Sequence, residues 1–97
     1  MDAMSVIDEK EVLIDELGKA NKELVTATIT YKEVQSGLWL NTDFESELGK
    51  KRPTVDEKKA YVSYHSLEHR KQREIAEYNK ELILAKIKLC DDKLGVL

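Results

Sequence analysis

The sequence predicts an all-α protein: an antiparallel helical hairpin with two long, coiled-coil-like helices and a short helix at the bend. Three observations predict this fold. Apolar residues recur at heptad spacing over two long stretches, only 4 of the 97 residues are glycine, and the single proline lies between the two stretches. We expect one domain, with helices over about residues 6–38 and 55–94 and the bend over residues 39–53.

The first helix is expected over about residues 6–38, where apolar positions alternate in steps of four and three. One stretch within it disagrees: residues 25–31 alternate apolar and polar side chains and are rich in β-branched residues, which is typical of a strand. Because the heptad pattern continues through this stretch, we expect helix there and keep a strand as the alternative. The predicted inner seam comprises Leu13, Leu17, Ala20, Leu24, Ala27, Tyr31, Val34 and Leu38.

The bend is expected to contain a short helix. Thr42 and Glu45 have the spacing of a capping box at its start, and Gly49 suits the position just after its end. Pro53 prevents the helix from running through the bend. The apolar residues of this region are expected to fill space and close the end of the hairpin: Trp39, Phe44, Leu48 and Val55.

The second long helix is expected to begin at Val55, because Thr54 and Glu57 form a second capping box directly after the proline. Its predicted seam contains one extra step of four near Lys71, which indicates a stutter. Towards the C-terminus the apolar face widens, which predicts more than one neighbouring helix. The predicted seam comprises Ala60, Tyr64, Leu67, Lys71, Ile75, Tyr78, Leu82, Ala85 and Leu89, with Ile83, Ile87, Cys90 and Leu94 beside it.

Charge and exposed apolar area both favour association. Residues 1–48 carry a net charge of −7 and residues 49–97 a net charge of +4, so pairing of the two helices is electrostatically favoured. Because two paired helices leave much apolar surface in water, we expect copies of the chain to form a dimer or a larger bundle. The expected interface with another copy or another protein comprises Leu17, Leu24, Val25, Ile29, Tyr31, Ile75, Tyr78, Leu82, Ile83, Ile87 and Leu89.

Two basic clusters suggest a competing function. They are separated by about three helical turns of the second helix and can neutralise phosphates, although aromatic side chains are not interleaved with them as stacking platforms. The simpler interpretation is a solvated face that balances the acidic first helix. Contact with DNA or RNA is therefore the alternative hypothesis, carried by Lys50, Lys51, Arg52, Arg70, Lys71 and Arg73.

Catalysis and cofactor binding are not expected. The chain lacks a phosphate-binding glycine loop, a nucleophile elbow and a C-x-x-C motif, so we expect a non-enzymatic protein without a cofactor. His65 and His69 lie four residues apart but have no third ligand at metal-binding spacing. They are interpreted as solvated histidines, with a metal shared across a symmetric interface as the alternative.

The location is expected to be the cytoplasm. Cys90 is the only cysteine and so forms no intrachain disulfide, as is usual in a reducing compartment. The acidic N-terminus lacks the basic and apolar regions of a signal peptide. No apolar run approaches the roughly 20 residues that span a bilayer.

The bend also carries a resemblance. The string formed by Leu40, Thr42-Asp43-Phe44, Leu48-Gly49 and Lys59-Ala60-Tyr61-Val62, between charged heptad helices, resembles small uncharacterised helical-hairpin proteins of phages and prophages of Gram-positive bacteria. It covers about the central third of the chain, and no functional residues come with it. The resemblance implies a phage accessory protein that acts in the bacterial cytoplasm, and we expect it to bind a phage or host protein.

Overall fold

The computed structural model describes residues 2–96, which form four α-helices. Helix α1 spans Ala3–Asn41, α2 Phe44–Leu48, α3 Val55–His65 and α4 Leu67–Val96. Within residues 2–96 no residue lies in a β-strand, so the all-α prediction is confirmed. Residues 25–31 lie inside α1, which excludes the strand alternative for that stretch.

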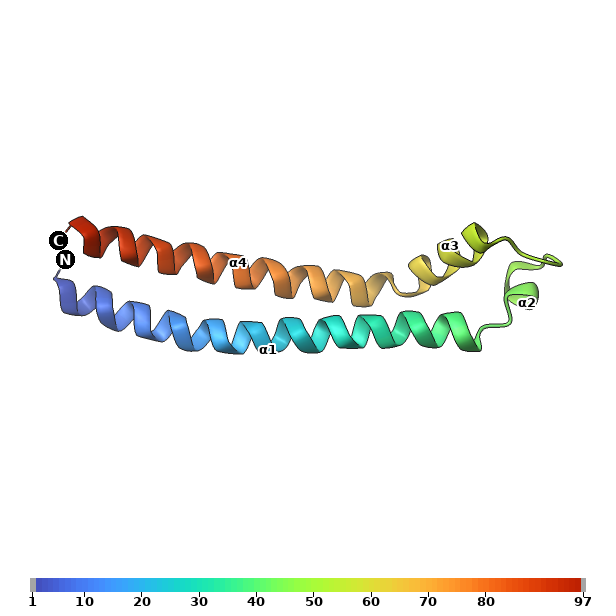
Figure 1. Cartoon of the computed structure of the whole chain (residues 1–97), viewed down its shortest axis with the longest axis horizontal. Helices are drawn as coiled ribbons and strands as arrows, with labels where there is room; N and C mark the ends of the chain where they lie inside the picture. The colour runs from blue at the N-terminus through green and yellow to red at the C-terminus, as the bar shows by residue number, and fades with distance from the viewer. Residues whose placement is uncertain (1, 97) are drawn as a thin grey trace. The chain divides into compact units, whose positions relative to one another are not determined.

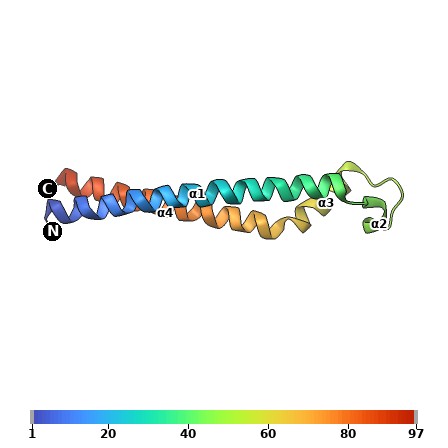
Figure 2. The ribbon, with the colours of Figure 1, turned by 90° about the horizontal axis from the view of Figure 1, so that it is seen from below.

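The chain divides into two compact units, and each is described by itself. The first unit contains the described residues up to Thr26 and those from Glu74 onwards, and the second contains residues 27–73. In the first unit, the N-terminal part of α1 lies beside the C-terminal part of α4, and the two segments run in opposite directions (Figures 1 and 2). In the second unit, the remainder of α1 is followed by α2, α3 and the first residues of α4.

The core of the first unit is built from both of its helices. Val6 and Leu13 of α1 are buried together with Cys90 of α4, and Ile87 and Leu94 of α4 pack against them. Cys90 is only 1% exposed, so it is a small apolar core residue, as expected for a lone cysteine on a helix face. An ion pair between Lys10 of α1 and Asp91 of α4 joins the two helices beside this core.

The predicted seam of α1 faces inward. Leu13 and Ala20 are buried, and the other six predicted positions are half-buried. By contrast, Val25 and Ile29 are exposed, as their place outside the heptad seam predicts. The spacing of apolar residues therefore identified the inner face of this helix along its length.

The predicted seam of α4 is wrong. Ile75, Tyr78, Leu82 and Leu89 are exposed, and so is Lys71, where a stutter was expected. The inward row advances in steps of four and three without interruption, so it needs no stutter and keeps one face towards α1. This inner row comprises Val62 and Ser66, followed in α4 by His69, Arg73, Ala76, Lys80, Ile83, Ile87, Cys90 and Leu94.

The short helix α2 begins one residue later than expected. Asp43, and not Thr42, is its N-cap: the Asp43 carboxylate accepts a hydrogen bond from the Ser46 backbone N–H at 3.3 Å. Aspartate is at least as good an N-cap as threonine, which explains the change of one position. Gly49 ends the helix with a φ of 61°, a left-handed conformation in which glycine carries no Cβ penalty.

The start of α3 was predicted correctly. Thr54 accepts a hydrogen bond from the Glu57 backbone N–H at 3.1 Å, and the Glu57 carboxylate accepts one from the Thr54 backbone N–H at 3.3 Å. Both halves of the capping box are thus present.

The helix expected over residues 55–94 is divided at Ser66. This residue is 0% exposed, and its hydroxyl donates to the Val62 carbonyl oxygen at 2.6 Å. Its backbone has φ −107° and ψ 6°, outside the helical region. A serine that bonds back to the preceding turn competes with the helical ladder and bends the helix, so α3 and α4 are separate elements.

Aromatic side chains close the bend of the second unit. Trp39 and Phe44 meet edge to face with ring centroids 5.8 Å apart, and Phe44 meets Tyr61 in the same way at 5.6 Å. Leu48 is half-buried, but Val55 is 57% exposed and lies outside the cluster that it was expected to join. Tyr61 of α3 packs against Phe44 instead.

Candidate interaction surface

An extended apolar row lies on the outer side of α4, within the first unit. It consists of Ile75, Tyr78, Leu82, Ala85 and Leu89, which we call the outer row. The four large members are 60%, 61%, 41% and 58% exposed, respectively, and Ala85 is also exposed. Their steps of three and four are those of a coiled-coil seam, so these side chains form a continuous stripe on one face of the helix.

A groove borders the outer row in the first unit. Its apolar lining comes from Ala20 of α1 and from Leu82 and Ile83 of α4, and its volume is about 310 Å³. Leu82 belongs to the outer row and Ile83 to the inner row, about 100° apart around the helix. The outer row is therefore continuous with apolar surface that reaches α1. The polar residues around the groove are Glu16, Lys19, Glu23, Asn79 and Lys86.

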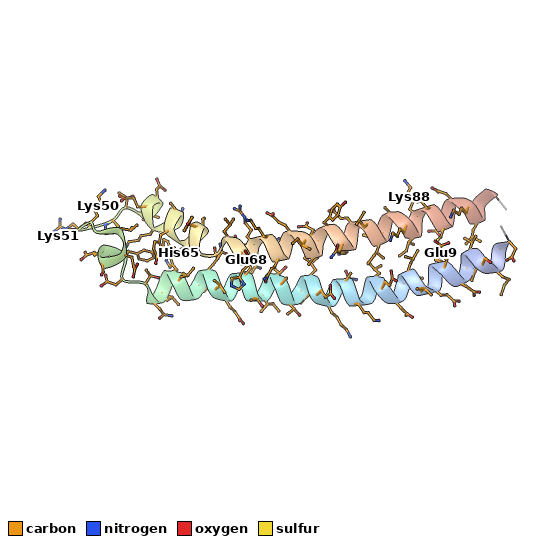
Figure 3. The ribbon with its side chains drawn as sticks, turned by 180° about the vertical axis from the view of Figure 1, so that it is seen from behind. Glu9, Lys50, Lys51, His65, Glu68 and Lys88 are labelled. Atoms are coloured by element: carbon orange, nitrogen blue, oxygen red, sulfur yellow. The ribbon has the colours of Figure 1, made fainter. Side chains whose placement is uncertain are left out.

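Charged residues flank the outer row in an asymmetric pattern. Heptad geometry places Glu74, Glu81 and Lys88 along one edge and Asn79, Lys86 and Lys93 along the other. Figure 3 shows Lys88 projecting from α4 on the side away from α1. Towards the C-terminus, the charge along the first edge thus changes from negative to positive. The charge along the second edge changes from neutral to positive.

The predicted interface residues divide into two groups. Leu17, Leu24 and Tyr31 of α1 and Ile83 and Ile87 of α4 are half-buried on the inner faces. Six others are exposed: Val25, Ile29, Ile75, Tyr78, Leu82 and Leu89. Sequence reasoning therefore reversed the two faces of α4, treating the outer row as the seam and Ile83 and Ile87 as surplus. The signal that sequence reasoning missed was the inner row, whose heptad spacing is unbroken although several of its residues are polar.

The two basic clusters lie in the second unit, and their members differ in exposure. Lys51 and Arg52 are exposed in the loop before α3, and neither makes an ion pair among the contacts of residues 2–96. Figure 3 shows Lys50 and Lys51 at this bend. Arg70 and Lys71 of α4 are exposed, whereas Arg73 is half-buried on the inner row.

Lys50 is engaged within the chain. Its ammonium group lies 2.8 Å from the Glu57 carboxylate. The hydrogen bond from Lys50, followed by the backbone hydrogen bond from Thr54, lowers the pKa of Glu57 below its usual value. Lys50 is therefore tied to the start of α3, and Lys51 and Arg52 are the freer cations of that loop.

The two histidines lie on different helices, because the chain breaks at Ser66. His65 is exposed at the end of α3 and stacks with Tyr61 at a centroid distance of 4.1 Å, while His69 is half-buried on α4. Desolvation, with a contribution from the Glu47 carboxylate, raises the pKa of Tyr61. Across the described part of the chain, no group of three or more His, Cys, Asp or Glu side chains is placed to hold a metal ion.

No family model, curated protein or solved structure matches the chain. Among the helices of residues 2–96, none has an apolar stretch of the length and purity needed to cross a bilayer.

Proposed function

We propose that this chain is a non-enzymatic accessory protein of phage type that acts through protein–protein interaction as an oligomeric helical bundle. The observation that carries the proposal is the outer row of α4. A monomer would leave these large apolar side chains in water, although their spacing is that of a helix–helix seam. The exposed apolar surface supports binding to a phage or host protein as the activity, and the sequence resemblance implies the bacterial cytoplasm as its location.

The proposal includes the antiparallel hairpin as the protomer of the bundle. Two findings support it: opposed helices share one core in the first unit, and an aromatic cluster follows the end of α1 in the second. A two-helix protomer buries one stripe of each helix, so further apolar rows need another copy. The outer row of α4 provides one such face.

Light scattering coupled to size-exclusion chromatography tests this proposal. At micromolar concentration the protein is expected to elute as a dimer or a larger assembly. Leu82→Glu places a charge in the outer row and is expected to yield a smaller species that remains helical by circular dichroism. The matched control is Leu84→Glu, because Leu84 is exposed to a similar extent, 44% against 41%, but lies outside the row. A well-folded wild-type monomer would contradict the proposal.

Nucleic-acid binding is the second candidate, and the exposed, unpaired Lys51 and Arg52 favour it. Labelled single- and double-stranded DNA and RNA would be titrated at two salt concentrations. If these cations hold phosphates, affinity falls steeply with salt, and Lys51→Gln/Arg52→Gln binds more weakly than the control Lys19→Gln/Lys22→Gln on α1. The leading proposal predicts no binding even at low salt.

A further inference from the structure

We propose that the outer row of α4 docks against the outer row of a second copy, with the two α4 helices antiparallel and Leu82 of each copy facing Ala85 of the other. This inference rests on the proposed self-association and specifies its surface, orientation and register. The partner is a second copy of this chain. When one copy is turned end to end, its outer row and flanking charges are complementary to those of the other copy.

The apolar layers match in this arrangement. Two-fold symmetry pairs Leu82 with Ala85 twice and Tyr78 with Leu89 twice, which gives four consecutive layers. Each central layer opposes a large side chain to a small one, so the helices can approach closely. All four residues are exposed in the isolated chain, and Ile75 lies at the edge of the stripe.

The flanking charges select the antiparallel orientation. In that orientation residues on the same edge face each other, so Glu81 meets Lys88 of the second copy, and this pair occurs twice. On the other edge, the neutral Asn79 meets Lys86. In a parallel pair, opposite edges face each other: Glu81 would attract Lys86, but Lys88 would face Lys93 of the second copy. Each attraction is then offset by a like-charge contact that opposes association.

The charges also select the register. Sliding one antiparallel helix by one heptad places Glu81 opposite Glu81 of the second copy and Leu89 opposite Lys71. The first contact is repulsive, and the second sets a charge against an apolar side chain. The slide also brings Glu74 opposite Lys88 of the second copy, so the repulsion between the two Glu81 side chains is what disfavours it.

A slide by one heptad in the other direction is disfavoured for two reasons. It places Lys88 opposite Lys88 of the second copy and Leu82 opposite Asp92. The register centred between Leu82 and Ala85 instead combines four apolar layers with two attractive Glu81–Lys88 pairs and brings no like charges together on the flanking edges. In this register Ile75 faces Asp92 of the second copy at each end of the stripe.

The geometry predicts the outcome of reversing single charges. Lys88→Glu would convert both attractive pairs into Glu–Glu contacts and weaken the dimer by roughly fivefold to thirtyfold at low salt. Glu81→Lys would weaken it similarly, and the double reversal Glu81→Lys/Lys88→Glu would restore the wild-type affinity. A parallel dimer gives the opposite sign for Lys88→Glu, because the introduced carboxylate would then attract Lys93 of the second copy.

Sedimentation equilibrium of the full chain and these three variants, at low and at moderate salt, measures the dimer dissociation constant. Circular dichroism monitors folding, which exposed charge changes should leave intact. Weakening by each single change and rescue by the double change support the inference. A wild-type dimer that Lys88→Glu strengthens or leaves unchanged overturns this docking geometry alone, whereas a wild-type monomer overturns both the inference and the proposed function.

Discussion

Replacing Leu13 by alanine is expected to lower the free energy of unfolding by about 3 kcal/mol. Leu13 is 6% exposed and belongs to the buried cluster of the first unit with Val6 and Cys90. Truncation removes buried methyl groups and leaves a space that two straight helices cannot close without shifting their backbones. In a chain of this size such a loss corresponds to a fall in melting temperature of at least roughly 10 °C.

Circular dichroism during thermal and urea denaturation measures this effect. Protein concentration must be the same for every variant, because association adds to the apparent stability. Ile14→Ala is the matched control: Ile14 is adjacent in sequence but 50% exposed, so its truncation is expected to cost less than about 1 kcal/mol. Equal losses in the two variants would show that the inner face of α1 has been placed incorrectly.

The features that sequence predicted well depend on local physics or on one strong pattern. The capping box at Thr54 and Glu57 needs only residues three positions apart, and Gly49 needs only its own backbone conformation. The inner face of α1 was found because one stripe of its apolar residues keeps heptad spacing along the helix, whereas exposed apolar residues such as Val25 and Ile29 lie outside that stripe. In each case the information is contained within a few turns of chain.

The features that sequence missed depend on a choice between two possible heptad rows on α4 or between two possible backbone conformations at Ser66. On α4 the outer row is the more hydrophobic stripe, so counting apolar residues selected it as the seam. The inner row includes Ser66, His69, Arg73 and Lys80, which such a count penalises, although its spacing is unbroken. The Ser66 break was missed because a serine can also lie within a helix, and the sequence does not show that this hydroxyl donates a hydrogen bond back to the Val62 carbonyl oxygen.

The candidate surface shows the same limit. Its residues were named from sequence, but their division into inner and outer groups required the neighbouring helix. The charges of Glu81 and Lys88 acquired a meaning only when the outer row was known to be exposed. An amphipathic pattern thus predicts that a helix has partners, whereas the structure decides which face each partner takes.

Replacing His69 by leucine and Arg73 by methionine together is expected to raise the free energy of unfolding by about 1–3 kcal/mol. Both residues lie on the inner row in the second unit, and His69 Nδ1 and Arg73 Nε are buried without a hydrogen-bond partner among the described residues. A buried polar atom that gives up water without a replacement partner costs free energy, and an apolar side chain of similar size avoids that cost.

Tyr31 and Gln35 of α1 are half-buried in the same unit, where the Gln35 amide donates a hydrogen bond to the Tyr31 hydroxyl at 3.1 Å. The control is Lys71→Met, because Lys71 is exposed between the two positions, and its effect is expected to stay within about 0.5 kcal/mol. Urea denaturation at one fixed protein concentration compares the three proteins.

The sign of this effect distinguishes two roles for the polar layer. If His69 and Arg73 only lower the stability of the second unit, the apolar variant has a higher free energy of unfolding and its helices unfold at a higher urea concentration. A loss of stability would show that the two side chains are held by favourable contacts that outweigh their desolvation. A gain in stability together with a change in oligomeric state would indicate that the layer specifies how helices pair, as single polar residues do within coiled-coil seams.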